Sequence, residues 1–288
     1  MRSFNSTTNS GFSSGPSSGC NGLDIFQSLI LGLVQGITEF LPISSSGHLV
    51  LTERLLNIRA GDLVFEVMVH LGTLVAVIIY FRRQLRDICT ALAKSLTSKE
   101  KTDADKSNLR LTWFLILGTI PAALFGFFLQ DMVEAAFASP RWTSGEFIVT
   151  GMVLIATIWA RDRGRSLSNW NTIAIGVAQA ISIMPAISRS GSTIAAGMFS
   201  GIDKGKAAEF SFLLSIPAIA GATILKVPDF LHLLPDHHLL RIYLAGTLVS
   251  GIVGYLSIKW LLDIIRRGKF FYFGIYCILI GVLGLILF

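Results

Sequence analysis

The chain has 288 residues, of which 52% are apolar and only 15% are charged, and its mean hydropathy is +0.64. This composition excludes an ordinary soluble domain and predicts an integral membrane protein. The formal charge of +6 would suggest nucleic-acid binding in a soluble chain. Membrane proteins, however, keep lysine and arginine on cytoplasmic loops, so we expect no nucleic-acid partner.

Residues 1–22 are rich in serine, glycine and asparagine, and this composition predicts a disordered tail. The tail lacks the basic start, the apolar core and the small-residue cleavage site of a signal peptide. Residues 23–288 are predicted to form a single membrane domain. Cys20, Cys89 and Cys277 lie far apart, without the spacing of a zinc site or a disulfide framework.

Two stretches, residues 23–57 and 171–201, combine apolar helical sequence with a polar interruption. The first is broken near Pro42 and the second near Pro185. The polar runs that follow are Ser44-Ser45-Ser46-Gly47-His48 and Ser188-Arg189-Ser190-Gly191-Ser192-Thr193. Polar groups at membrane depth are costly and usually face a cavity or a substrate path. Irregular backbone is tolerated there only inside the protein, so we expect two re-entrant hairpins, each made of helix, break and helix.

Six further stretches approach the roughly 20 apolar residues that a membrane-spanning helix needs. They are residues 64–81, 111–130, 145–160, 207–226, 241–260 and 270–288. Basic residues cluster at 82–110, at 161–170 and around 266–269, and we expect these connections in the cytoplasm. The connections 131–144 and 227–240 hold one basic residue between them, Arg141, so we expect them outside, together with both termini.

The two hairpins belong to an internal repeat. One constant shift places Gly32, Gln35, Ser44, Ser46 and Gly47 on Gly176, Gln179, Ser188, Ser190 and Gly191. A second places Gly118 and Gly126 of one long helix on Gly246 and Gly254 of another. Each half, about 23–165 and 166–288, then holds a hairpin and three crossings, and an odd number of crossings inverts the second half. We therefore expect an all-α integral membrane protein with six transmembrane helices and two re-entrant hairpins in an inverted-topology repeat.

Both breaks are suited to binding phosphate. A helix N-terminus offers free N–H groups and a positive dipole end, and we expect short helices to begin near Gly47 and Gly191. Arg189 adds a planar fork that binds phosphate through two parallel hydrogen bonds. The expected diphosphate-binding residues are Ser44, Ser46, Gly47, Ser188, Ser190, Gly191 and Thr193.

The first break also carries acid–base groups. Glu39 lies one helical turn after Gln35, so both side chains share a helix face. A carboxylate beside a phosphate pocket is interpreted as a ligand of a divalent cation, Mg²⁺ or Ca²⁺, with Gln35 as a second candidate ligand, or as a general base. His48 offers acid–base capacity, and a serine beside such groups can be activated as a nucleophile.

Each of these motifs also has a purely structural interpretation. Serine and glycine clusters in membrane helices often serve close packing, and Arg189 could pair with Glu39 as a buried ion pair. A lone histidine such as His48 is often a hydrogen-bonded core residue. Glu66 and His70, at helical spacing in 64–81, are interpreted as structural or as support for the site. Glu, Ser and His in one break, with Ser, Arg and Thr in its repeat, together favour a site.

The motifs Gly-Ile-Thr-Glu-Phe-Leu-Pro-Ile-Ser-Ser-Ser-Gly-His (36–48) and Pro-Ala-Ile-Ser-Arg-Ser-Gly-Ser-Thr (185–193) closely resemble those of the undecaprenyl-diphosphate phosphatases, also called the bacitracin-resistance proteins. The resemblance runs from about Leu23 to Phe288. It implies a multi-pass enzyme of the bacterial cytoplasmic membrane that removes the terminal phosphate of undecaprenyl diphosphate on the outer side. Such an enzyme recycles the lipid carrier for peptidoglycan and opposes bacitracin.

The resemblance also implies residue roles: Glu39 as the catalytic or metal-binding acid, Ser45 as the nucleophile, His48 as the acid–base group and Arg189 as part of the phosphate-binding motif. The chain departs from the family pattern at Gln35, where many members have a second glutamate. It departs more mildly at Ala186, where glycine is common. A mechanism that needs two carboxylates on the first helix is therefore in doubt.

The sequence thus predicts metal-assisted hydrolysis of a phosphoanhydride, in which Ser45 or, alternatively, water attacks the terminal phosphorus. The alternative function is a translocase for the same carrier lipid, because inverted repeats with broken helices are also the plan of transporters. The expected partner is undecaprenyl diphosphate in the bilayer, with a homodimer left open.

Overall fold

The structure, a computed structural model, describes residues 23–56, 58, 63–97, 101–128, 139–225 and 236–287. The predicted tail lies outside these residues. Within them every regular element is a helix, as expected. The helices are α1 (Ile25–Thr38), α2 (Ser45–Leu55), α3 (Leu63–Tyr80), α4 (Arg82–Thr97), α5 (Asp103–Phe128), α7 (Pro140–Ala156), the 3₁₀ turn η1 (Thr157–Trp159), α8 (Asn169–Ile181), α9 (Arg189–Phe199), α10 (Lys204–Leu225), α12 (His237–Arg266) and α13 (Tyr272–Leu287).

The first expected hairpin is a helix, a break and a second helix. Asp24 begins α1 by accepting a hydrogen bond from the backbone of Gln27, whose side chain returns a bond to Asp24. The helix ends at Thr38, and five residues of turn lead to Ser44. Ser44 has a φ of 65°, a left-handed conformation that residues other than glycine seldom adopt. Its hydroxyl then accepts from the Gly47 N–H and starts α2.

The second hairpin repeats this plan. Ser168 begins α8 with the same reciprocal cap, here to Asn171. The helix ends at Ile181, and the Ser188 hydroxyl accepts from the Gly191 N–H, 3.1 Å away, at the start of α9. Both short helices therefore begin where the sequence predicts them.

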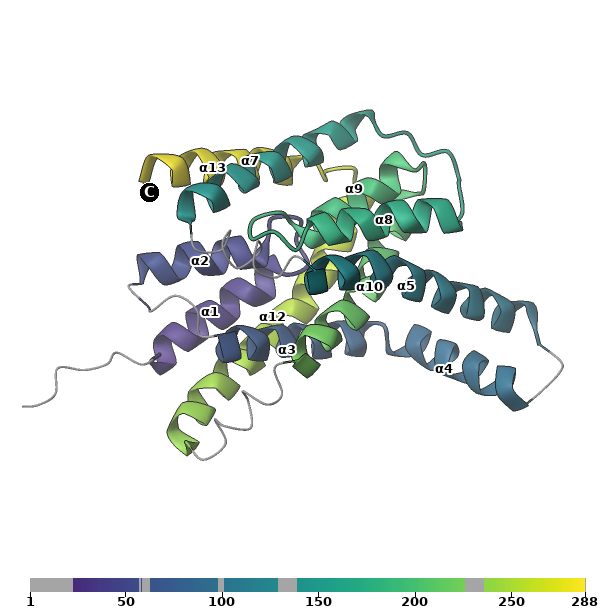
Figure 1. Ribbon diagram of the computed structural model, residues 1–288, viewed down its shortest axis with the longest axis horizontal. Helices are drawn as coiled ribbons and strands as arrows, with labels where there is room; N and C mark the ends of the chain where they lie inside the picture. The colour runs from purple at the N-terminus through teal and green to yellow at the C-terminus, as the bar shows by residue number, and fades with distance from the viewer. Residues whose placement is uncertain are drawn as a thin grey trace, which may run out of the picture.

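Each hairpin packs on a long helix of the other half of the chain. Helix α1 contacts α12, and α8 contacts α5 (Figure 1). A methyl group added at Gly32 would collide with the backbone of Gly246, and one at Gly176 would lie 2.7 Å from the carbonyl oxygen of Gly118. These close backbone contacts require glycine, and the two glycine pairs occupy equivalent places in the proposed repeat.

In the part of the chain that the structure describes, four helices are long and apolar enough to cross a membrane: α5, residues Arg141–Trp159, α10 and α12. A fifth crossing results if α3 and α4, which are bent by 76° to each other, count as one broken span. Helix α13 is apolar but has only 16 residues. The six expected stretches are thus all mainly helical, while four or five spans meet the length criterion. The full set of six crossings remains a prediction.

The connection 82–110 contains more structure than a cytoplasmic loop. It holds the whole of α4 and the first turns of α5, which run side by side away from the other helices (Figure 1). Helix α4 buries Ile88 and Ala91, and its Lys94 lies 3.3 Å from Asp105 of α5. The repeated apolar positions of α4, rather than its many basic residues, explain why α4 packs against α5.

The largest apolar cluster encloses the backbone of both breaks. Phe40 and Ala186, one in each break, are fully buried, and Phe40 meets Phe212 of α10 edge to face, with ring centroids 5.6 Å apart. The irregular backbone of both breaks is thereby kept inside the protein, which the prediction of re-entrant hairpins requires.

Candidate functional site

The two breaks are joined by hydrogen bonds that each donates to the backbone of the other. The Ser44 and Ser46 hydroxyls both donate to the carbonyl oxygen of Pro185 in the opposite break, Ser44 at 2.9 Å. In return, the Ser190 hydroxyl donates to the carbonyl oxygen of Leu41 at 3.0 Å. The two serine bonds give the Pro185 carbonyl oxygen its donors, and Ser190 adds a second donor to the Leu41 carbonyl oxygen, which also accepts from the Ile43 N–H. They bring together segments about 140 residues apart in the sequence.

A cavity of about 350 Å³ lies where the breaks meet. Its polar lining comes from both breaks and from α3, and its apolar lining comes mainly from α10. The lining residues are Glu39, Ser44, Ser45, Ser46, Glu66, Val67, His70, Ser182, Ile183, Ile187, Ser188, Arg189, Ala218, Ile219, Ala222 and Thr223. The first residues of α2 and α9 are among them, so both helix N-termini border this cavity.

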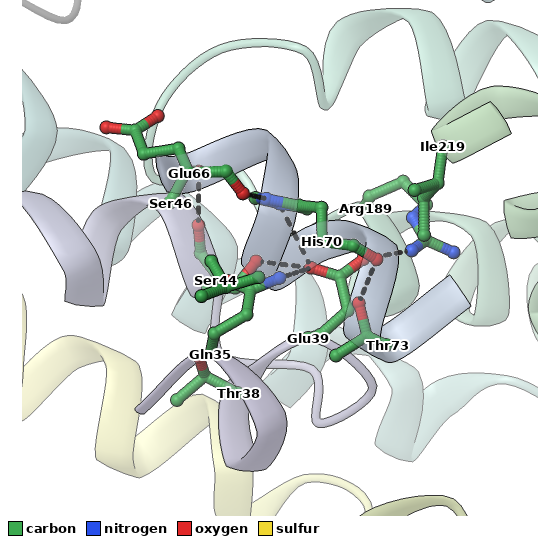
Figure 2. A network of polar contacts seen from close by, with 12 residues as sticks. Gln35, Thr38, Glu39, Ser44, Ser46, Glu66, His70, Thr73, Arg189 and Ile219 are labelled. Carbon is green, nitrogen blue, oxygen red and sulfur yellow. Dashed lines mark hydrogen bonds and ion pairs between the residues drawn. The ribbon is translucent and has the colours of Figure 1, made fainter. Parts of the chain in front are cut away.

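Glu39 is the centre of the polar network in this cavity (Figure 2). Its Oε1 accepts from Arg189 Nη2 in a buried ion pair. Its Oε2 accepts from the Ser45 hydroxyl at 2.6 Å and from Gln35 Nε2 at 3.0 Å, and lies 3.5 Å from His70 Nε2. A buried carboxylate is stable only when such donors replace water. The structural alternative for Arg189, a pairing with Glu39, is thus observed, and it lies inside the cavity.

One donor group of Arg189 is buried without a partner among the described residues. Its Nη2 binds Glu39, whereas Nη1 is buried and has no hydrogen-bond partner among the described residues. A buried, unpartnered donor of a charged group is unfavourable by about 1–3 kcal/mol or more. An anion in the cavity would satisfy it.

His48 lies away from this network. Its Nδ1 is 2.7 Å from the Ser44 carbonyl oxygen, and its Nε2 is 2.8 Å from the Tyr276 hydroxyl. The ring also stacks on Tyr276 and meets Phe147 edge to face. Both ring nitrogens are engaged outside the cavity, so this geometry gives the predicted acid–base role no support.

His70 and Glu66 are the cavity residues that the sequence interpretation placed in a supporting role at most. Both line the cavity from α3, and His70 contacts Glu39 directly. Their spacing of four residues on one helix face was the available signal. What the sequence could not reveal is that this face of α3 turns toward the first break.

The predicted diphosphate-binding residues divide into two groups. Ser44, Ser46 and Ser188 line the cavity, together with the predicted Glu39, Ser45 and Arg189. Gly47, Ser190, Gly191 and Thr193 lie behind it. Thr193 donates to or accepts from the Ser211 hydroxyl at 2.6 Å, and a methyl group at Gly47 would lie 2.6 Å from the ring of Phe147. These four positions shape the breaks, and their predicted ligand contacts remain untested.

The cavity residues fit a divalent cation only when phosphate completes the ligands. Among the described residues no group of three or more His, Cys, Asp or Glu could hold a metal ion alone. Glu39 and Glu66 both line the cavity, however, and Gln35, which donates to Glu39, has a buried Oε1 without a hydrogen-bond partner among the described residues. Mg²⁺ often takes only one or two carboxylates and completes its shell with water and substrate phosphate.

A larger cavity, of about 530 Å³, lies elsewhere, between η1, the start of α10 and the turn from α12 to α13. Its charged lining residues are Asp162, Asp203 and Lys204. The Asp162 and Asp203 carboxylates accept from nearby backbone N–H groups. This cavity has no counterpart of the Glu39 network, so the smaller one is the better candidate site.

Comparison with known proteins shows one family. The model of the family described as "Bacitracin resistance protein BacA" matches residues 28–283. Curated proteins named "Undecaprenyl-diphosphatase" are similar over nearly the whole chain. The protein from Korarchaeum cryptofilum is 41% identical over 262 residues, covering 90% of this chain and 98% of the relative. The one from Moorella thermoacetica is 40% identical over 268 residues, covering 91% and 97%.

Proposed function

The chain belongs to the bacitracin resistance protein BacA family, and from this membership we propose that it is an undecaprenyl-diphosphatase. It releases inorganic phosphate from undecaprenyl diphosphate and leaves undecaprenyl phosphate. The relatives that carry this name are about 40% identical over nine tenths of the chain. The substrate is a membrane lipid, consistent with the apolar helices described above.

One observation carries the proposal: Arg189, whose buried Nη1 has no hydrogen-bond partner among the described residues, lines the same cavity as Ser45 and the first residues of two helices. Guanidinium N–H groups and helix N-termini are the usual donors to phosphate. Phosphoryl transfer needs mainly positioning and neutralisation of charge, and these groups supply both at one point.

In the proposed mechanism Ser45 is the nucleophile and Glu39 its base. The Ser45 hydroxyl already donates to Glu39 Oε2 at 2.6 Å, so the proton has an acceptor when the oxygen attacks. An Oγ–P bond forms, the bridging P–O bond breaks, and undecaprenyl phosphate leaves. Water then hydrolyses the phosphoserine. Glu39 replaces His48 as the base because His48 does not border the cavity.

Glu39, with the amide oxygen of Gln35 as a second candidate ligand, would hold the divalent cation. When bound, it would neutralise charge on the diphosphate oxygens. Direct attack by water remains the alternative mechanism. In that case Ser45 would donate a hydrogen bond only.

The architecture proposed for this enzyme is the inverted repeat with six crossings and two re-entrant hairpins. The site then opens to the outer side of the bacterial cytoplasmic membrane, and both termini lie outside. Its proposed role is to recycle the lipid carrier for cell-wall synthesis and thereby to confer resistance to bacitracin. A homodimer is tested by light scattering in detergent.

The test is phosphate release by purified protein in detergent micelles, with undecaprenyl diphosphate and Mg²⁺ but without a second compartment or a gradient. The diphosphatase releases phosphate continuously, and the Glu39→Gln variant, as the control, releases none. A protein that only translocated the lipid would release no phosphate in micelles, and that result would overturn the proposal.

A further inference from the structure

His70 is the contribution of α3 to the Glu39 network, which otherwise comes from the two broken hairpins. Gln35 and Glu39 belong to the first hairpin, as does Ser45, and Arg189 belongs to the second. Figure 2 shows His70 reaching from α3 toward the Glu39 carboxylate. Its Nε2 lies 3.5 Å from Glu39 Oε2, the same oxygen that accepts from Ser45.

The other nitrogen of the ring fixes its orientation. His70 Nδ1 lies 2.7 Å from the carbonyl oxygen of Glu66, one turn earlier on α3. A carbonyl oxygen only accepts, so Nδ1 carries a hydrogen and the ring is held with Nε2 toward Glu39. Nε2 donates to the carboxylate in the ring form that carries a hydrogen on both nitrogens. Helix α3 is itself packed closely on α12. At Gly72 the two backbones lie so near each other that an added methyl group would collide with the backbone of Thr247.

Glu39 needs such support because it caps the C-terminal end of α1, with helical backbone, and the irregular turn of the first break follows it directly. Arg189, in the second hairpin, pairs with Glu39 Oε1. Ser45 and His70 contact the other carboxylate oxygen, Glu39 Oε2. A carboxylate held at both oxygens has one orientation, with Oε2 kept beside the attacking hydroxyl. Reacting groups displaced by even about 1 Å can lose about a hundredfold in rate.

From this geometry we propose that His70 is a positioning residue. From α3, which belongs to neither hairpin, it holds the Glu39 carboxylate in the orientation that keeps Oε2 beside the Ser45 hydroxyl. The inference rests on the proposed function, and it assigns His70 no contact with the reacting phosphorus. It also separates the two histidines near the break: His70 positions the base, whereas His48 joins the start of α2 to Tyr276.

Two substitutions separate the two ring contacts. The amide nitrogen of glutamine lies at the place of Nε2, so His70→Gln keeps a donor to Glu39 and loses the bond to Glu66. The amide nitrogen of asparagine lies at the place of Nδ1, so His70→Asn keeps the hydrogen bond to the Glu66 carbonyl and loses the contact with the Glu39 carboxylate. Both variants are neutral amides, which makes them a matched pair.

We expect His70→Gln to keep kcat within about tenfold of the wild type, and His70→Asn to lose about a further 10- to 150-fold, the range for one hydrogen bond to a charged group. KM for undecaprenyl diphosphate should change little in either variant. A merely structural role would predict equal losses, or larger ones for glutamine, since only asparagine preserves the contact within α3.

The outcomes are distinct. Equal kcat values for the two variants, a better asparagine variant, or a loss confined to KM would each overturn the inference. Thermal unfolding midpoints near the wild-type value establish that both variants fold. If His70→Asn does not fold, His70→Leu takes its place, because leucine also lacks a donor to Glu39. Absence of phosphate release by the wild type would instead overturn the proposed function.

Discussion

Removal of the Ser45 hydroxyl distinguishes a nucleophile from a hydrogen-bond donor. Ser45 donates to Glu39 Oε2 at 2.6 Å and lines the cavity beside Arg189. The loss of one hydrogen bond to a charged group is worth about 1.5–3 kcal/mol, which corresponds to roughly 10- to 150-fold in rate at about 1.4 kcal/mol per tenfold. Loss of a nucleophile is larger, so we expect Ser45→Ala to lose at least about a thousandfold, or about 4 kcal/mol of transition-state stabilisation.

The neighbouring serines are the matched controls. Ser44 and Ser46 donate to the neutral carbonyl oxygen of Pro185, and a bond of this kind contributes about 0.5–1.5 kcal/mol. Ser44→Ala and Ser46→Ala should therefore lower thermal stability and reduce kcat by no more than about tenfold. The assay is initial phosphate release in detergent at saturating lipid, with unfolding midpoints measured in parallel. If Ser45→Ala keeps a tenth of the wild-type rate, direct attack by water is the better mechanism.

The remaining predictions concern charge, metal and orientation. Arg189→Lys should lose most of the activity despite its charge, because an ammonium cannot form two parallel hydrogen bonds to phosphate; near-normal turnover would remove Arg189 from the phosphate contact. Glu39→Gln should abolish phosphate release at any Mg²⁺ concentration, and an active variant would make Glu66 the next candidate. EDTA should stop the wild-type enzyme and Mg²⁺ or Ca²⁺ should restore it, whereas a chelator-resistant rate would argue against the cation. In intact cells lacking exposed native thiols, an impermeant reagent should modify a cysteine at Ser139 but not one at Lys101; the reverse pattern would invert the proposed orientation.

The broken hairpins could be predicted because their signals are local. Proline, glycine and hydroxyl residues interrupt an apolar run, and Ser44 and Ser188 supply the caps at which α2 and α9 begin. Helix α4 could not be predicted in the same way, because its many basic residues are typical of a cytoplasmic connection. Its buried positions, Ile88 and Ala91, have meaning only once α5 lies against them.

The sequence predicts that side chains of the two breaks come together, but not which contacts they make. Glu39, Ser45 and Arg189 share the cavity, as their occurrence in matching breaks suggested. The direction of a hydroxyl or an imidazole depends on which backbone approaches it in three dimensions. Ser46 therefore bonds to Pro185, and the histidine beside Glu39 is His70, neither of which sequence spacing specifies.

The central claim is that phosphate binds where the two breaks meet, and a structure with a non-hydrolysable isoprenyl methylene-bisphosphonate and Mg²⁺ tests it most directly. The account predicts that a phosphonate oxygen lies about 3 Å from Arg189 Nη1 and that the terminal phosphorus faces the Ser45 hydroxyl. A bisphosphonate bound instead in the larger cavity beside Asp162 and Lys204, with Arg189 still paired only to Glu39, would contradict it.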